Sequence, residues 1–303
     1  MSRPLVSVVV ASYRSATTLP RHLASLAAQT RSDFEIIVVD SSPDDGSAQA
    51  VRDSGVPVEL VRSAERLLPQ EARNRGAAAA RGELLVFTDP DVYLAPDWLD
   101  RLVASHLEQG HPVVGALDCW GDRWLDRGIH LTKFSKFLPA GPPRPVDTAP
   151  TATFLCPRRL FESVGGFPAR PFQGDALLAW RLLEAGIVLW FEPRAVADHH
   201  HLSAFGDFLR ERFRRGLELG HLRATWSRHR RIDDLWFLAV SLVPVRLTRI
   251  LLLVSRHAVR AGWGLHLLLT LPVVASGHAA NLFGESLAYA RRLASPGPSE
   301  GPD

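Results

Sequence analysis

The chain has 303 residues, of which 46% are hydrophobic, so it can bury a large core and is neither disordered nor fibrous. Its formal net charge is only +3, because 35 basic residues nearly balance 32 acidic ones. This balance does not suit binding along a phosphate backbone, and we expect no nucleic-acid partner. The two cysteines, Cys119 and Cys156, lie far apart without metal-binding spacing, which is typical of a reducing compartment.

The first 110 residues alternate between apolar runs and helical patterns. The runs predict strands near residues 5–10, 34–39, 58–62 and 83–88, and the helical patterns lie near 18–29, 46–53, 69–81 and 96–109. Strands and helices that alternate in this way join by right-handed crossovers into a parallel sheet. The sequence therefore predicts an α/β domain built on a doubly wound, mostly parallel sheet.

The patterning after this region is less regular. Further strands are predicted near 112–117, 152–156, 187–191 and 194–198, with helices near 175–185 and 203–219. The stretch from about 118 to 150 contains a Pro/Gly cluster at 139–145, and we expect it to form an irregular loop or lid.

Carboxylates follow two of the predicted strands. Asp40 ends the second strand, and Asp89-Pro90-Asp91 follows the fourth. Ligands of open α/β sheets bind outside the carboxyl ends of strands, so Asp89 and Asp91 could hold a divalent cation and, through it, a diphosphate. Asp and Pro are also ordinary turn residues, and a capped loop is the alternative. The first strand ends in Ala11-Ser12-Tyr13-Arg14, which lacks the glycine pattern of a dinucleotide site or a phosphate loop.

Several motifs occur together in a fixed order. They are Val6 to Tyr13, Val39-Asp40, Asp45-Gly46-Ser47, Ala72-Arg73-Asn74-Arg75-Gly76, Arg81-Gly82-Glu83 and Thr88-Asp89-Pro90-Asp91. In this order and spacing the chain resembles family 2 glycosyltransferases of the GT-A fold across about 215 residues. The resemblance implies an enzyme that takes a sugar from a nucleotide diphosphate.

The resemblance also implies roles for individual residues on the donor side. The base would meet Ala11, Ser12, Tyr13 and Asp40, with Arg73 nearby. Asp89 would contact the ribose or a metal-bound water, and Asp91 would ligate Mn²⁺ or Mg²⁺. His199, in the run Asp198-His199-His200-His201, could complete the metal site or meet the diphosphate; a solvated His-rich turn is the alternative. Because neighbouring residues of a strand alternate faces, at most one or two of these histidines could ligate one ion.

The acceptor side is implied by a second segment. Gly165-Gly166-Phe167, Phe172 to Asp175 and Ala179 to Leu182 resemble the region where the family carries an acidic pair. Asp175 matches its second member, the general base, which would deprotonate the acceptor hydroxyl. Gly174 replaces the first acidic residue, and a further acidic position is Leu177. The alternative for Asp175 is a charge that favours the helix N-terminus.

The composition becomes more apolar from Leu235. Residues 261–284 carry no formal charge over a length close to that of a membrane span, although Pro272 and two histidines weaken that interpretation. In the segment before it, the arginines fall on one side of a helix, opposite Leu, Ile and Val: Arg246, Arg249, Arg256 and Arg260. We expect membrane association through 235–290, and packing on the domain is the alternative.

These features predict three segments. Residues 1–225 form the transferase domain, with a nucleotide-sugar half at 1–117 and an acceptor half at 118–225; 226–290 form membrane-associated helices and 291–303 a disordered tail. The expected enzyme is inverting and metal-dependent, and moves a sugar from a UDP- or GDP-sugar to a hydroxyl of a glycan or lipid-linked cell-envelope acceptor. It would act at the cytoplasmic face of the membrane, because the chain starts directly with a strand. The alternative is an inactive nucleotide-binding membrane scaffold of the same fold.

Overall fold

The computed structural model describes residues 3–169, 173–226 and 244–294. The chain divides into two compact units, one formed by Met1–Gly121 with Phe137–His201 and the other by Asp122–Lys136 with Leu202–Asp303. Phe172 of the predicted acceptor segment lies outside the described residues, as do 227–243 of the predicted membrane segment and 295–303 of the predicted tail.

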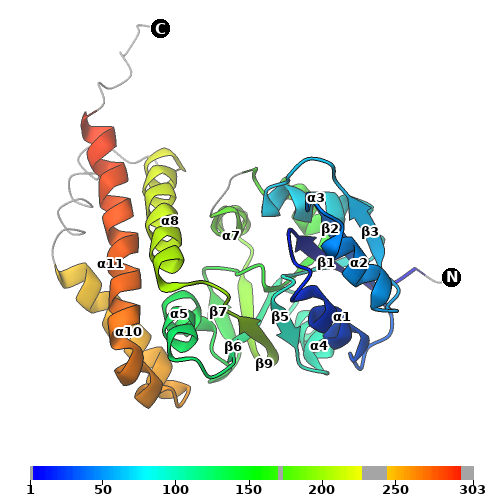
Figure 1. The fold of residues 1–303 in the computed structure, drawn as a ribbon, viewed down its shortest axis with the longest axis horizontal. Coiled ribbons are helices and arrows are strands. Elements are labelled where there is room, and N and C mark those ends of the chain that lie inside the picture. The colour runs from blue at the N-terminus through cyan, green and yellow to red at the C-terminus, as the bar shows by residue number, and fades with distance from the viewer. Residues whose placement is uncertain (1–2, 170–172, 227–243, 295–303) are drawn as a thin grey trace, which may run out of the picture. The chain divides into compact units, whose positions relative to one another are not determined.

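The first unit is built on one sheet, which has nine strands among the described residues. Four parallel strands form its first half in the order β3-β2-β1-β4 (Figure 1): β1 (Val6–Ser12), β2 (Phe34–Asp40), β3 (Glu59–Arg62) and β4 (Leu84–Thr88). Runs of Val and Ile suit these strands because β1, β2 and β4 are buried on both faces. The register pairs Ser12 with Asp40, so the carboxyl ends of β1 and β2 are level.

The second half of the sheet is mixed. Strand β8 (Thr153–Pro157) is antiparallel to β4 and to β6 (Val113–Trp120), and β6 is parallel to β9 (Leu189–His200). Two short strands, β5 (Val92–Leu94) and β7 (Arg144–Val146), pair antiparallel with β9. The chain therefore returns from Asp89-Pro90-Asp91 into the sheet at once, beside the end of β9.

Six helices of the described residues in this unit pack on this sheet, and the sequence predicts all of them except α6. They are α1 (Leu19–Ala27), α2 (Gly46–Asp53), α3 (Pro69–Ala79), α4 (Trp98–Gln109), α6 (Arg158–Ser163) and α7 (Gly174–Glu184). A core cluster joins α3, α6 and α7 to the sheet. At its centre, Phe87 of β4 packs edge-on against Phe167 and tilted against Phe161, with ring centroids 5.0 and 5.3 Å away. The core thus holds the strand that precedes Asp89.

The expected loop or lid at 118–150 is wrong in part. This stretch contains the helix α5 (Trp124–Phe134), a 3₁₀ turn at Ser135–Phe137 and the strand β7. Residues 128–132 of α5 are all buried, which a surface loop would not show. The two strands predicted near 187–191 and 194–198 form the single strand β9, whose register with β6 shifts at Gly115/Ala116.

The second unit is helical in its described part. It contains α5, α8 (Phe205–Trp226), α10 (Pro244–Arg260) and α11 (Gly264–Ala294), and α11 runs along α8 (Figure 1). Small residues allow this close approach. A Cβ at Gly216 of α8 would lie 1.9 Å from the carbonyl oxygen of Asn281, and one at Gly284 would lie 2.1 Å from that of Phe213. Helix backbones thus meet where side chains would normally hold them apart.

A buried carboxylate ties three helices of this unit together. Glu285 of α11 is 1% exposed and accepts hydrogen bonds from Arg223 of α8, from Arg246 of α10 and from Tyr289 one turn later. The Arg246 bond is 2.8 Å and the Tyr289 bond 2.7 Å. A charge this deep is tolerated only when it is paired and hydrogen-bonded.

The units place two segments differently from the predicted domains. Residues 122–136 and 202–225, which the sequence assigns to the transferase domain, belong to the second compact unit. The functional division into 1–225, 226–290 and 291–303 stays a prediction.

Candidate active site

Asp40 is held rigidly at the carboxyl end of β2. Its side chain is fully buried, and its Oδ1 accepts hydrogen bonds from Ser12 Oγ at 3.2 Å and from Ser42 Oγ at 2.6 Å. Its Oδ2 is also buried but accepts no hydrogen bond from the described part of the chain; Arg62 Nη1, at the end of β3, lies 3.5 Å from it. A fixed carboxylate with one unused buried oxygen can accept a hydrogen bond from a ligand.

Tyr13 lies beside Asp40 on the loop after β1. Its half-buried ring is flanked by two guanidinium groups, with Arg66 Cζ 4.4 Å and Arg14 Cζ 5.5 Å from the ring centroid. Arg14 has a positive φ of 53°, and its amide donates to Ser42 Oγ at 2.7 Å. The loops after β1 and β2 are thereby joined, and the half-buried Ala11 lies at the end of this edge.

Arg73 and Asp89 form the next part of the site. Arg73 of α3 is 6% exposed, and its Nη2 lies 2.5 Å from Asp89 Oδ1. The neighbouring motif residues fix α3 in place. Asn74 exchanges hydrogen bonds of 2.8 and 3.0 Å with the backbone of Phe167, and a Cβ at Gly76 would lie 2.3 Å from Val9 Cγ1. The sequence motif at 72–76 therefore serves to aim Arg73 at Asp89.

Asp91 lies in a short connection that is held by backbone bonds. Its carbonyl oxygen accepts from the amide of His200 at 2.8 Å, and the Val92 amide donates to the Asp89 carbonyl at 3.1 Å. The antiparallel register of β5 and β9 then places His199 opposite Val92. Asp91 and His199 are thus brought to the same corner of the sheet by the β5–β9 ladder.

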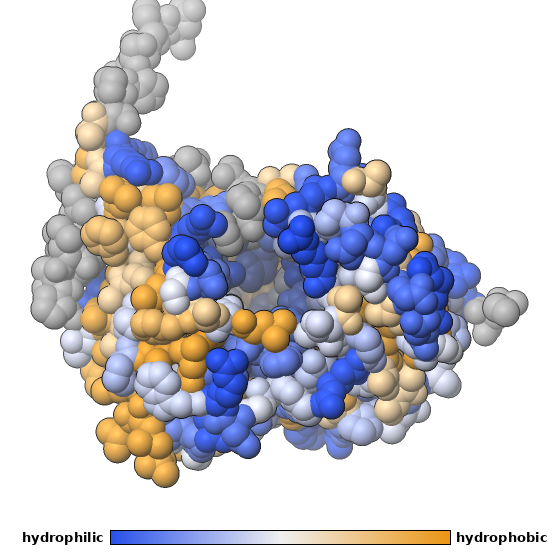
Figure 2. Space-filling model, viewed as in Figure 1, coloured by the Kyte–Doolittle hydropathy of each residue, from blue (hydrophilic) through white to orange (hydrophobic). Residues whose placement is uncertain are grey.

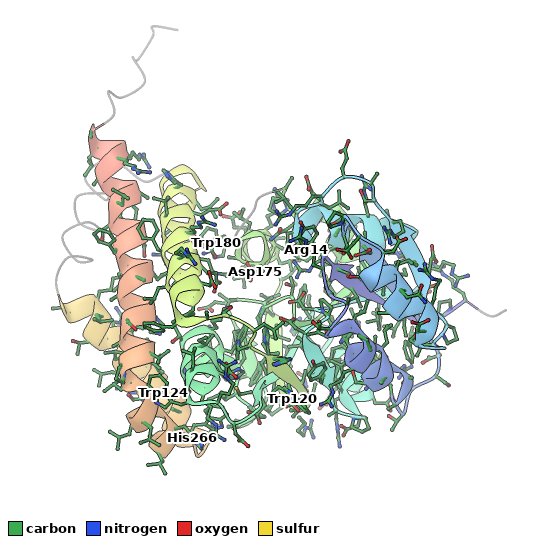
Figure 3. All side chains as sticks on the ribbon, viewed as in Figure 1. Arg14, Trp120, Trp124, Asp175, Trp180 and His266 are labelled. Atoms are coloured by element: carbon green, nitrogen blue, oxygen red, sulfur yellow. The ribbon has the colours of Figure 1, made fainter. Side chains whose placement is uncertain are left out.

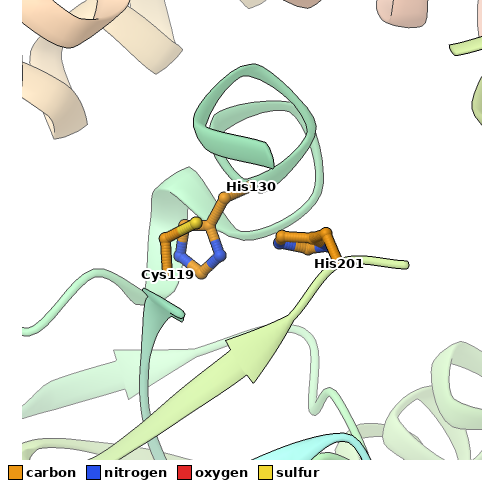
Figure 4. A group of neighbouring side chains, drawn as sticks. All are labelled: Cys119, His130 and His201. Carbon is orange, nitrogen blue, oxygen red and sulfur yellow. The ribbon is translucent and has the colours of Figure 1, made fainter. Parts of the chain in front are cut away.

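The histidine run alternates faces of β9, as the sequence predicts. The rings of His199 and His201 stack with centroids 4.6 Å apart, whereas His200 lies 3.2 Å from the hydroxyl of Tyr93 through its Nδ1. Cys119 Sγ of β6 lies within 4.8 Å of a ring nitrogen of His201 (Figure 4). His130, also labelled there, belongs to α5 of the second unit.

These carboxylates suit a hard divalent cation. Asp91 and the partly exposed Asp89 offer oxygen ligands at a strand end, and His199 offers a nitrogen. Oxygen ligands suit Mg²⁺ and Mn²⁺, and imidazole is compatible with several first-row metals. Asp89 and Asp91 therefore have the ligand chemistry of the metal that the sequence motif implies, and their role as metal ligands, with that of His199, stays a prediction.

Asp175 lies in the first turn of α7, where Figure 3 labels it. Its Oδ1 accepts a 2.9 Å hydrogen bond from the amide of Ala176. Gly174 before it packs against Gln70 of α3, because a Cβ at Gly174 would lie 2.3 Å from Gln70 Cγ. Gln70 precedes Arg73 by one turn, so α3 links the Asp175 segment to the Asp89 segment. Leu177 is buried in α7 and offers no polar group.

Two buried side chains of this region were missed by sequence reasoning. His22 of α1 is 0% exposed, and its Nδ1 lies 2.5 Å from the carbonyl oxygen of Val92, directly after Asp91. Gln70 is 6% exposed, and its Oε1 has no hydrogen-bond partner among the described residues. Both occupy the buried stripe of a helix, where a single polar residue gives no signal in one sequence.

Burial lowers the pKa of His22 below its ordinary value of 6.5, although the charges of Asp89 and Asp91 oppose this effect. The ring is therefore held neutral in the folded protein at pH 7, with one nitrogen able to donate to Val92.

The sequence model described as "Glycosyl transferase family 2" matches residues 7–164, more than half of the chain. The chain belongs to glycosyl transferase family 2. The site at the ends of β1, β2 and β4 lies inside the matched region.

Two relatives illustrate the range of the family. The chain is 28% identical over 225 residues to a pre-mycofactocin glycosyltransferase of Mycobacterium tuberculosis, a match that covers 67% of this chain but only 44% of that protein. It is 32% identical over 159 residues to an undecaprenyl-phosphate 4-deoxy-4-formamido-L-arabinose transferase of Aeromonas hydrophila, covering 45% and 48% of the two chains. The chain thus spans less than half the length of these relatives.

Among solved structures, the fold is similar to that of the mannosyltransferase PcManGT from Pyrobaculum calidifontis in complex with GDP-Man and Mn²⁺. The two superpose with a TM-score of 0.62 at 22% identity, over 96% of this chain and 87% of the other. This likeness confirms the predicted α/β fold of GT-A type.

Proposed function

We propose that this family member is a metal-dependent, inverting glycosyltransferase. It moves a sugar from a UDP- or GDP-sugar to a hydroxyl of a glycan or a lipid-linked acceptor, and it acts at the cytoplasmic face of the membrane. The observation that carries this proposal is the set of carboxylates at one sheet edge, Asp40, Asp89 and Asp91. Ser12 holds the first, Arg73 holds the second, and the third is placed by the backbone bond of its residue to His200. The undecaprenyl-phosphate transferase among the relatives supports a lipid-linked acceptor, and the Mn²⁺ complex of the structural neighbour supports a metal.

The pair of Asp40 and Arg62 supports the class of base. The unused oxygen of Asp40 can accept from a ring N–H, while Arg62 Nη1, 3.5 Å away, can donate to an adjacent carbonyl. Uracil and guanine carry an N–H beside a carbonyl, whereas neutral adenine and cytosine carry a ring-nitrogen acceptor beside an amino group. A buried site built to hydrogen-bond this N–H and carbonyl disfavours a base that lacks them, because its own donor and acceptor would be left without partners.

On this proposal Asp91 and His199 would hold the divalent cation that binds the donor diphosphate, while Asp89 stays oriented by Arg73. A divalent cation bound there supplies Lewis-acid stabilisation of the charge on the departing nucleoside diphosphate. Asp175 accepts the proton of the acceptor hydroxyl as that oxygen attacks the anomeric carbon. A single displacement of this kind inverts the configuration of the anomeric carbon.

Thermal unfolding of the purified protein with UDP, GDP, CDP or ADP, each with and without Mn²⁺, tests the donor site. A ligand at 100 times its dissociation constant stabilises the folded state by about 2.7 kcal/mol. We expect Mn²⁺-dependent stabilisation by UDP or GDP and little by CDP or ADP. Asp91→Asn should lose this response. Asp97→Asn should keep it, because the Asp97 side chain is 46% exposed and pairs with Arg101 of α4.

No stabilisation by any nucleotide would contradict the donor-site assignment. Stabilisation that is equal with and without Mn²⁺ would contradict metal dependence alone. The configuration of the product, read by NMR from the anomeric coupling of the transferred sugar, tests inversion separately.

A further inference from the structure

The exposed face of α10 is apolar. Val245, Leu252, Leu253 and Val259 are each between 42% and 67% exposed, and at 100° per residue they lie within about 120° of one another around the helix. Val254 and Ala258, which are buried, occupy the opposite side. A helix of a soluble protein normally hides such a face.

Three arginines share this exposed face. Arg249, Arg256 and Arg260 are exposed and fall between Val245 and Leu253 on the helix projection. This differs from the prediction that all four arginines lie opposite the apolar side, because Arg246 turns inward to Glu285 and exposed leucines flank the other three. Helix α10 contains no acidic residue, so its free face is both apolar and cationic.

The start of α11 extends this character. Leu265, Leu268, Leu269 and Leu271 are between 40% and 69% exposed, and no charged residue occurs from Gly264 to Gly284. Trp124 of α5, which is 52% exposed, donates its indole N–H to the carbonyl oxygen of Leu269 at 2.8 Å. Trp124 and His266 mark this end of the unit in Figure 3, and apolar residues gather there in Figure 2.

Helix α11 passes the length and composition test for a membrane span, but one of its sides packs against α8 and α5 within its own unit. Gly277 meets the ring of Phe208, Gly284 meets the backbone of Phe213, and the buried Glu285 pairs with two arginines. A spanning helix would have to give up these contacts or carry Glu285 toward lipid. The exposed large apolar side chains of these two helices instead gather on α10 and the first turns of α11, and Phe283, farther along α11, is a further one at 64% exposed.

We infer that this surface, Val245 to Val259 of α10 with Leu265 to Leu271 of α11 and Trp124, docks the enzyme in the plane of a bilayer that contains anionic lipid. The leucines and valines enter the boundary between head groups and acyl chains, and Arg249, Arg256 and Arg260 extend to lipid phosphates. Tryptophan beside them suits the same boundary. The inference rests on the proposed function, which includes a lipid-linked acceptor. It deepens that function by assigning the surface that meets the membrane.

A second copy of the chain is the less suitable occupant. A two-fold contact through this face would bring Arg249, Arg256 and Arg260 against the same three arginines of the other copy, with no acidic residue on α10 to offset them. Anionic head groups complement these charges. Each basic residue near an anionic surface raises the affinity about five-fold.

Vesicle binding of the full-length protein tests the inference. Protein is added to preformed vesicles of phosphatidylcholine alone or of phosphatidylcholine with phosphatidylglycerol, and binding is measured by sedimentation. We expect binding to the mixed vesicles to fall about 100-fold in Arg249→Gln/Arg256→Gln/Arg260→Gln, with little change on neutral vesicles. Leu252→Ser/Leu253→Ser/Leu268→Ser should weaken binding to both.

The control is Leu107→Ser, which removes a leucine that is 71% exposed on α4 of the first unit and should leave vesicle binding unchanged. Circular dichroism confirms that each variant is folded, and stabilisation by UDP or GDP with Mn²⁺ is measured on the same preparations.

Loss of vesicle binding with intact nucleotide response separates this inference from the donor-site proposal. The inference would be overturned if the wild-type protein binds neither kind of vesicle. It would also be overturned if the arginine and leucine variants bind as well as wild type. A dimer in light scattering that the leucine variants convert to monomer would overturn it as well, since that result assigns the face to a second copy.

Discussion

The two compact units distribute charge in opposite ways. The first places carboxylates at the edge of its sheet and holds each by a donor from another element, as Ser12 holds Asp40 and Arg73 holds Asp89. The second places its carboxylate, Glu285, at the centre of a helix cluster and leaves leucines outside. The first arrangement keeps oxygen atoms available to a ligand. The second uses the buried Glu285 to join helices, and its surface suits lipid.

The largest effect should come from Asp175, in the unit that carries the chemistry. Asp175→Asn removes the proposed proton acceptor and should lower the rate of sugar transfer by about 10²- to 10⁴-fold, while nucleotide binding is unchanged. Glu184→Gln, an exposed carboxylate at the other end of α7, is the matched control. Full activity of Asp175→Asn would return the residue to the role of a helix N-terminal charge.

In the second unit the corresponding carboxylate should matter for stability. Glu285→Ala leaves Arg223 and Arg246 without their shared partner, and removal of one member of a buried ion pair costs about 3 kcal/mol. We expect a loss of this size in the free energy of unfolding, measured by urea titration. If the urea midpoint is unchanged, the buried network does not hold the helices together.

A smaller loss should follow from adding one methyl group between α8 and α11. Gly216→Ala forces a Cβ against the carbonyl oxygen of Asn281, and we expect a loss of about 1–3 kcal/mol from overpacking. Gly206→Ala, on the same helix with open space around it, should instead be neutral or slightly stabilising. Equal behaviour of the two variants in thermal unfolding would contradict the close helix contact.

The smallest effect concerns His22, whose pKa is lowered in the folded state. The unfolded protein then binds more protons than the folded protein between the folded-state pKa and about 6.5, so stability rises with pH across that window and is lost as pH falls through it. His22→Leu should flatten this pH dependence and also release the carbonyl of Val92.

Measured as unfolding midpoints from pH 5 to 8, the wild type should gain stability relative to His22→Leu as the pH rises from 5 to about 6.5, and the difference should then level off. Identical slopes for the two proteins would show that His22 is not held neutral. Mn²⁺ affinity of the same variant, compared with that of Asp97→Asn, reports whether the bond to Val92 also positions Asp91.

Much of the first unit could be predicted from the sequence because its signals are local. The Val-rich runs at 5–10 and 34–39 and the acidic residues that follow strands require only alternation and strand length. The helix α5 was missed because a Pro/Gly cluster downstream suggested an irregular region, and β5 was missed because three residues have no detectable period. Three of the four arginines predicted on one face of α10 are exposed, whereas Arg246 turns inward to Glu285, because which side is exposed depends on what packs against the other.

The sequence by itself determined the α/β alternation and the order of the motifs, because backbone sterics and side-chain alternation act within a few residues. Asp40, Asp89, Asp91 and Asp175 are its predicted site residues. Only the tertiary structure decided that Asp40 has an unused buried oxygen, that Gln70 fills the space beside Gly174, that His22 meets Val92 and that Arg246 turns inward. Each of these depends on groups tens of residues apart whose approach is set by how helices pack on the sheet or on one another, and packing is a property of the whole fold.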